Sequence, residues 1–130
     1  MAYFSTSIND SPVIAVKAAS DITSDFLAVE LTADGIKLPT AAGIAAIGLL
    51  IPGQEIKSGD TATVQIKDMG KWTTGAAVAI GDPLATDTSG KCVKAAEGAF
   101  ILGYALEAAT AADAVIAVQI TKSGYVPASA

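Results

Sequence analysis

The sequence predicts an all-β protein: a small antiparallel β-barrel or sandwich built from two related β-units, with an extended N-terminal arm and at most one or two short helical turns. Short runs of strand-forming residues recur between glycine-bearing turns, at spacings of about 8 to 15 residues. The length of 130 residues is that of about one domain. Part of the chain also repeats, as described below.

The first 25 residues are expected to form an arm. They are polar and unpatterned, apart from residues 12–16, which could form one short strand. Residues 26–125 are expected to form a single β-barrel domain, because the strand signals become regular from Phe26 onward. Residues 126–130 are then a C-terminal tail.

The domain is expected to open with a hairpin. Residues 26–32 are rich in strand formers, and Ala33-Asp34-Gly35 offers a turn that tolerates positive φ and leads into residues 36–38. Further strands are expected at residues 44–50, 61–67, 76–80, 84–87, 91–95, 100–106 and 115–121.

Two alanine-rich stretches, 41–49 and 105–114, are also compatible with helix, because alanine is the best helix former. Gly43, Gly48 and Gly103 count against that alternative. A short helical turn around residues 107–113 stays open.

The glycines and polar positions reveal an internal repeat, at about residues 43–70 and 98–124. The segment from Gly43 to Gly48 matches the segment from Gly98 to Gly103 at an offset of 55 residues, and Val64-Gln65-Ile66 matches Val118-Gln119-Ile120 at an offset of 54. Because neither unit alone can bury its apolar face, each is expected to supply the other's missing wall.

The composition excludes several kinds of chemistry. The chain has no His, and all eight cationic side chains are Lys, so His-based catalysis, His-based metal sites and the arginine fork are impossible. The formal net charge is −5 and the lysines are spread singly, so no nucleic-acid partner is expected. No cofactor is expected either, because the phosphate-binding glycine motifs are missing.

No membrane partner is expected. The start of the chain lacks a basic stretch followed by an apolar run, and the longest apolar stretch, residues 41–51, is too short to span a bilayer. These features predict a soluble protein made in a reducing cytoplasm.

Cys92 and three aspartates are the candidate reactive groups. Cys92 lies between two lysines, which could lower its pKa, but a lone Cys on an alternating strand is more often a small apolar residue. Asp60, Asp82 and Asp113 each precede a strand, which favours turn capping over a carboxylate metal cage. We therefore predict no catalytic residue and no metal site.

Trp72 lies in a stretch rich in turn formers, between two expected strands. On a loop it could be a buried anchor at a protein interface or could pack locally over the end of the barrel, and the two roles are equally favoured. The preceding Lys71 resembles, faintly, a hairpin lysine that carries biotin or lipoate, although a solvated turn lysine is the ordinary explanation.

Tyr3 and Phe4 are aromatic residues in the polar arm. Exposed aromatics near a terminus bury area only when the arm docks on something, so both are candidate partner-interface residues together with Trp72.

A succession of short pieces between Ala42 and Ile120 resembles the small capsid decoration, or cement, proteins of tailed bacteriophages. The most specific succession is Gly81-Asp82-Pro83-Leu84, then Asp87 with Gly90-Lys91, then the segment from Gly103 to Ala109. The likeness covers about residues 35 to 121.

This resemblance implies a β-rich subunit, usually a homotrimer, on the outer surface of the expanded head, where it clamps neighbouring major capsid subunits. The implied partners are the major capsid protein and further copies of this chain, and the implied location is the virion, after synthesis in the host cytoplasm. No catalytic residue comes with the family. The alternatives are another β-structural virion component, such as a tail or fibre subunit, and, least favoured, an enzyme or carrier domain.

Overall fold

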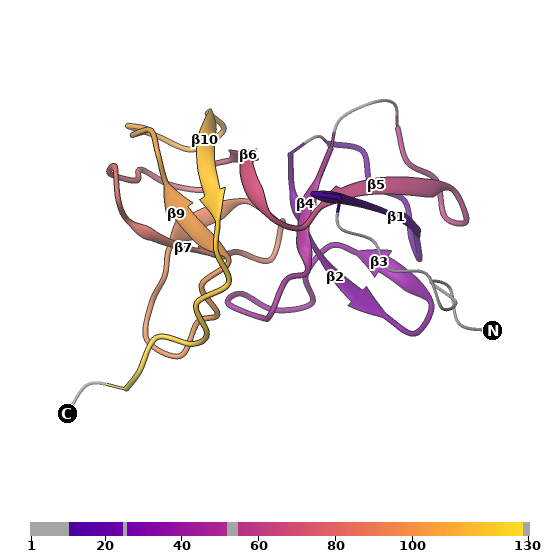
Figure 1. Ribbon diagram of the computed structural model, residues 1–130, viewed down its shortest axis with the longest axis horizontal. Coiled ribbons are helices and arrows are strands. Elements are labelled where there is room, and N and C mark those ends of the chain that lie inside the picture. Colours follow the sequence, from indigo (N-terminus) through magenta and orange to yellow (C-terminus); the bar gives the residue numbers. More distant parts are fainter. Residues whose placement is uncertain (1–10, 25, 52–54, 129–130) are drawn as a thin grey trace.

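The computed structural model describes residues 11–24, 26–51 and 55–128, and this part of the chain forms ten β-strands and no helix (Figure 1). The strands lie in two antiparallel five-stranded sheets, which stand side by side along the longest axis of the molecule. The strands are β1 (Val13–Lys17), β2 (Ala28–Thr32), β3 (Gly35–Lys37), β4 (Gly48–Leu50), β5 (Thr61–Gln65), β6 (Asp68–Thr73), β7 (Pro83–Thr86), β8 (Cys92–Lys94), β9 (Gly103–Ala105) and β10 (Val115–Ile120).

The two sheets have the same topology. The first has the strand order β1-β5-β4-β2-β3 and the second β6-β10-β9-β7-β8, so each strand of the first sheet corresponds to the strand five places later in the chain. The register agrees as well: Leu49 is paired with Gln65 in the first sheet, and Tyr104 with Gln119 in the second. The predicted pair of related units is confirmed, and the repeat extends beyond the two segments that the sequence indicated.

Each sheet curls until its two edge strands approach one another. A single parallel bridge, between Ala18 and Ile36, links the end of β1 to β3, and the bridge between Thr74 and Cys92 links the end of β6 to β8 in the same way. Because these contacts are isolated bridges rather than ladders, the described residues form no closed barrel. Of the barrel and the sandwich that the sequence predicted as alternatives, the fold is sandwich-like.

Each sheet folds around its own apolar interior. Alternation along β10 shows how the sequence specifies this: Ile116, Val118 and Ile120 are buried, as expected for one face of a pleated strand. The first core lies inside β1–β5, with Val16, Val29 and Val64 at its centre. The second core lies inside β6–β10, and it also takes in side chains from β2 and β4 of the first sheet.

The predicted β2–β3 hairpin is present. Gly35 has a φ of +123°, and the Asp34 N–H donates to Thr32 Oγ1 at 3.2 Å, which together form the tight turn. The short strand expected at residues 12–16 is also present, as β1, and it pairs with β5 over its whole length.

Two expectations for local structure were wrong. Residues 76–80 form no strand and contribute only an isolated bridge, between Val78 and Ala109. The stretch around Trp72 was expected to be a loop, but it is β6, which pairs with β10 over six residues. The helical turn left open at residues 107–113 is absent, and this segment consists of bends and a turn.

Candidate binding surface

The described residues contain no group of three or more His, Cys, Asp or Glu side chains placed to hold a metal ion. No helix in this part of the chain has the length and apolar character needed to cross a membrane. Cys92 is fully buried on β8, and burial raises the pKa of its thiol to about 12. Its thiol is therefore protonated near neutral pH, and the side chain acts as a small apolar residue.

Two of the three candidate aspartates cap turns. Asp60 Oδ2 accepts from the Lys57 N–H at 3.0 Å, and Asp82 Oδ2 accepts from the Ala79 N–H at 2.9 Å. Each carboxylate thereby satisfies a backbone donor in the turn ahead of a strand, the capping role favoured from the sequence.

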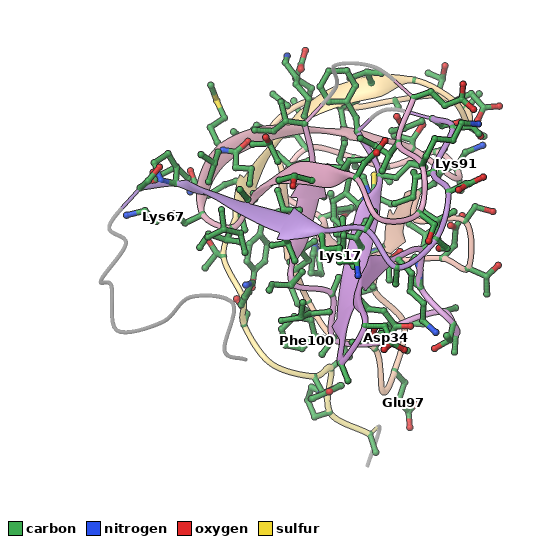
Figure 2. All side chains as sticks on the ribbon, turned by 90° about the vertical axis from the view of Figure 1, so that its right-hand side faces the viewer. Lys17, Asp34, Lys67, Lys91, Glu97 and Phe100 are labelled. Carbon is green, nitrogen blue, oxygen red and sulfur yellow. The ribbon has the colours of Figure 1, made fainter. Side chains whose placement is uncertain are left out.

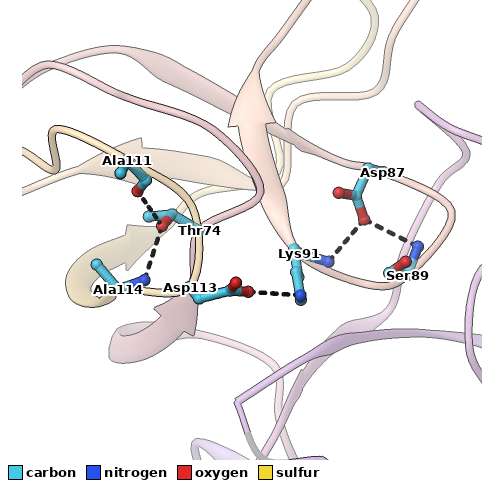
Figure 3. A network of polar contacts seen from close by, with 7 residues as sticks. All are labelled: Thr74, Asp87, Ser89, Lys91, Ala111, Asp113 and Ala114. Carbon is cyan, nitrogen blue, oxygen red and sulfur yellow. Dashed lines mark hydrogen bonds and ion pairs between the residues drawn. The ribbon is translucent and has the colours of Figure 1, made fainter.

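Asp113 has a different role. It belongs to a polar network that links the turn before β10 to the turn before β8 (Figure 3). Its Oδ1 lies 2.6 Å from Lys91 Nζ, and this contact raises the pKa of the lysine, chiefly through the hydrogen bond. Asp87 Oδ1 accepts from the backbone N–H groups of Ser89 and Lys91, both at 2.9 Å, and so fixes the turn that presents the lysine. The network is structural, because every charged group in it is paired within the chain.

Lys71 does not lie at a hairpin tip, where a carrier lysine would have to be presented. It stands in the middle of β6, paired with Ala117, and its Nζ lies 3.7 Å from Glu107 Oε1. The same Glu107 oxygen accepts from the Ala117 N–H at 2.6 Å. The geometry does not favour the carrier alternative.

Trp72, a predicted interface residue, offers no surface to a partner. Its side chain is 0 % exposed in the second core, and its indole N–H donates to the Gly90 carbonyl at 2.8 Å. Of the two roles that the sequence left open, the structure supports packing within the chain. The other two predicted interface residues, Tyr3 and Phe4, lie outside the described residues.

The positive charge is dispersed. Lys17 and Lys67, on the first unit, and Lys91, on the second, lie well apart (Figure 2). Such single cations give phosphate groups no concentrated site.

The main candidate for binding is the outward face of the second sheet, which we call the β6–β10–β9 face. Tyr104, Gln119 and Met69 stand side by side across β9, β10 and β6. Their side chains point away from the core, because they alternate with the buried residues of the same strands. Leu106, Ala117 and Lys71 form the neighbouring row, since the Leu106 N–H donates to the Ala117 carbonyl at 2.9 Å.

This face carries three of the six large apolar side chains that the described residues expose. Met69 is 61 % exposed, Val115 49 % and Leu106 42 %, and all three lie on it. Ile80, at 71 %, lies beside it, because the adjoining Gly81 N–H donates to the carbonyl of Ala105, the last residue of β9. Several large apolar side chains exposed on one sheet face make it a candidate protein-binding site.

Sequence reasoning missed this face, although a signal was present. Val115, Ala117 and Gln119 alternate with three large aliphatic residues, which marks them as one outward row. The pairing of that row with Met69 and Lys71 required β6, which the sequence did not reveal.

Comparisons with known proteins show what the chain as a whole is similar to. A sequence profile described as phage cement protein matches residues 8–120. Among solved structures, the N base of the head fiber gp8.5 in bacteriophage phi29 is similar, with a TM-score of 0.64 and 21 % sequence identity, over 86 % of this chain and 95 % of that one. At this identity, the likeness concerns the fold. A comparison with curated proteins finds no match.

Proposed function

Because the chain belongs to the phage cement protein family, a family of structural virion proteins, we propose that it binds the outer surface of an assembled phage capsid as an oligomer. There it stabilises the head by bridging neighbouring major capsid subunits. The observation that supports this most strongly is the family match over residues 8–120. A fold with large apolar side chains exposed on one sheet face, and with no unpartnered buried side-chain polar atom among its described residues, is consistent with a role in binding.

The mechanism is thermodynamic linkage. A protein that binds the assembled shell and not the separated subunits stabilises the shell by RT ln(1 + [L]/Kd), about 2.7 kcal/mol per site at a concentration 100-fold above Kd. Many sites on one particle multiply this effect.

Bare heads that lack the protein provide the direct test. Purified protein is added to saturation, and head opening is followed by a DNA-binding dye during a temperature ramp and during a denaturant titration. The proposal expects opening at a higher temperature and at a higher denaturant concentration. If saturating protein changes neither, the chain does not act as a cement.

We also propose that the N-terminal segment contributes to the contact with the capsid or with another copy, through Tyr3 and Phe4. Deleting residues 1–10 should weaken binding by more than about 1 kcal/mol, as truncation of an aromatic anchor does. The double variant Tyr3→Ala, Phe4→Ala is the finer test, because it keeps the length of the segment. Unchanged affinity in both variants would remove this segment from the interface.

A second candidate is a subunit of another virion part, such as a fibre or tail. The fold likeness to the N base of a head fiber favours keeping it. Electron microscopy of virions with a labelled chain separates the two candidates. Label spread over the head shell itself fits a cement protein, whereas label on the tail or in projecting fibres, head fibres included, fits the second candidate.

A further inference from the structure

The two related units differ in what covers their outward faces. In the first unit the outward row across β5, β4 and β2 consists of Gln65, Leu49 and Ala28. Leu49 and Ala28 are nevertheless buried, at 1 % and 0 % exposure, because they pack into the core of the second unit.

The second unit covers this row with two elements, β6 and the turn before β8. Gln65 Nε2 donates to the carbonyls of Lys67 and Met69, at 3.0 and 2.6 Å, and so holds the start of β6. The Ala28 N–H donates to the Gly90 carbonyl at 2.7 Å, in the turn between β7 and β8. The chain thus contains one complete joint between a unit and the unit that follows it.

The corresponding row of the second unit is Gln119, Tyr104 and Pro83, across β10, β9 and β7. None of the three is buried, and the Gln119 side chain makes no hydrogen bond to the described residues, whereas its counterpart Gln65 makes two. Gln119 and Tyr104 lie on the exposed β6–β10–β9 face, and Pro83 continues the row onto the neighbouring β7.

We propose that the β6–β10–β9 face binds the first unit of a second copy of this chain. In this contact, β1 of the second copy lies over the outward row of the second unit, just as β6 lies over the outward row of the first unit within one chain. The argument is the duplication itself. The two units share strand order and register, and one of them already shows which surface fits the outward row. The contact is head-to-tail, so repeated addition closes into a ring or grows into a filament. Three copies, as in a homotrimer, would place six units around such a ring.

The intrachain joint also indicates which residues would meet between copies. Between equivalent strand pairs, the β7–β8 turn is one residue longer than the β2–β3 turn, and counted back from the paired strands β3 and β8, Gly90 corresponds to Asp34. Ala28 corresponds to Pro83. Asp34 of one copy should therefore lie against Pro83 of the next. The inference rests on the proposed function only in expecting an oligomer, and it makes no use of the capsid.

Engineered cysteines test this pairing. The chain that contains both Asp34→Cys and Pro83→Cys should form disulfides between copies, seen as multimers on a non-reducing gel. The matched control keeps Asp34→Cys and replaces Pro83→Cys by Thr63→Cys, an exposed position on the outward side of β5. The native Cys92 is fully buried and does not interfere. Equal cross-linking in both chains, or none in either, would overturn the proposal.

A charge placed on the face is the second test. Leu106→Glu should lower the mass measured by light scattering from that of an oligomer to that of the 12.9 kDa monomer, while Thr63→Glu leaves the oligomer unchanged. Circular dichroism checks that both variants fold. If the native chain is monomeric at high concentration, the head-to-tail contact is refuted, even if the chain binds heads. If the chain forms an oligomer but fails to protect heads, only the proposed function is refuted.

Discussion

Trp72 is the largest side chain that the described residues bury completely, and replacing it should destabilise the fold rather than a partner interface. Trp72→Ala removes the whole indole from the second core, and truncations of buried Trp or Phe cost about 3–5 kcal/mol. The Gly90 carbonyl loses the indole N–H but keeps the Ala28 N–H, so this oxygen is not left without a donor. The broken hydrogen bond therefore contributes little to the decrease in the free energy of unfolding, and the cavity left by the indole contributes most of it.

The expected loss is a large part of the stability of an ordinary domain, which is about 5–15 kcal/mol. Trp72→Phe keeps most of the apolar volume and loses the hydrogen bond, which contributes about 1 kcal/mol, so its cost should lie well below that of the alanine variant. Met69→Ala is the matched control, because it lies on the same strand with its side chain 61 % exposed, and it should cost less than about 0.5 kcal/mol.

Urea unfolding at one fixed protein concentration, followed by far-ultraviolet circular dichroism, measures these differences. Circular dichroism is required because the substitution removes the chain's one tryptophan fluorophore. A loss below about 1 kcal/mol for Trp72→Ala with an unchanged slope would refute the packing argument. If the same variant kept its stability and lost affinity for heads, Trp72 would be an interface anchor after all.

Three further predictions concern single residues. Gly35→Ala should destabilise more than Gly59→Ala in urea unfolding. Both sites have positive φ, but of the two only Gly35 would bring an added Cβ against a backbone carbonyl, that of Lys17 in β1, and equal losses would contradict this. Cys92 should react with a thiol reagent many times more slowly in the folded chain than in urea, because its pKa is raised to about 12 by burial, and similar rates would show an exposed thiol. Asp113 raises the pKa of Lys91, so the contribution of this pair to stability is present below the ordinary lysine pKa of 10.5 and is lost as the pH rises through the folded value. Asp113→Asn should therefore flatten the decrease in the free energy of unfolding at alkaline pH.

The parts of the fold that follow local chemistry could be predicted from the sequence. The turn at Gly35 is specified by neighbouring residues, and the repeat was visible because Gln65 and Gln119 stand at equivalent places in two similar strands. The family resemblance also came from such short patterns of turn residues.

The strand β6 could not be predicted, because nothing local favours it. Gly70 and two charged residues give its sequence the character of a turn, and it forms because β10, far along the chain, pairs with it. A Cβ at Gly70 would lie 2.7 Å from Gln65 Oε1, so the end of that side chain would have to shift. Missing β6 displaced Trp72 from core to loop, and it concealed the exposed face that Met69 shares with Leu106.

Joining the two units in one chain, through only Ile66 and Lys67 between β5 and β6, has a kinetic consequence for assembly. The contact inside the chain forms as an intramolecular event, independent of how dilute the protein is, whereas a contact between chains depends on concentration. A molecule made of one unit would need every such contact to form by collision. In the proposed head-to-tail assembly, fusion halves the number of contacts that must form by encounter. It also leaves the two outward surfaces free to differ, one buried within the chain and the other exposed.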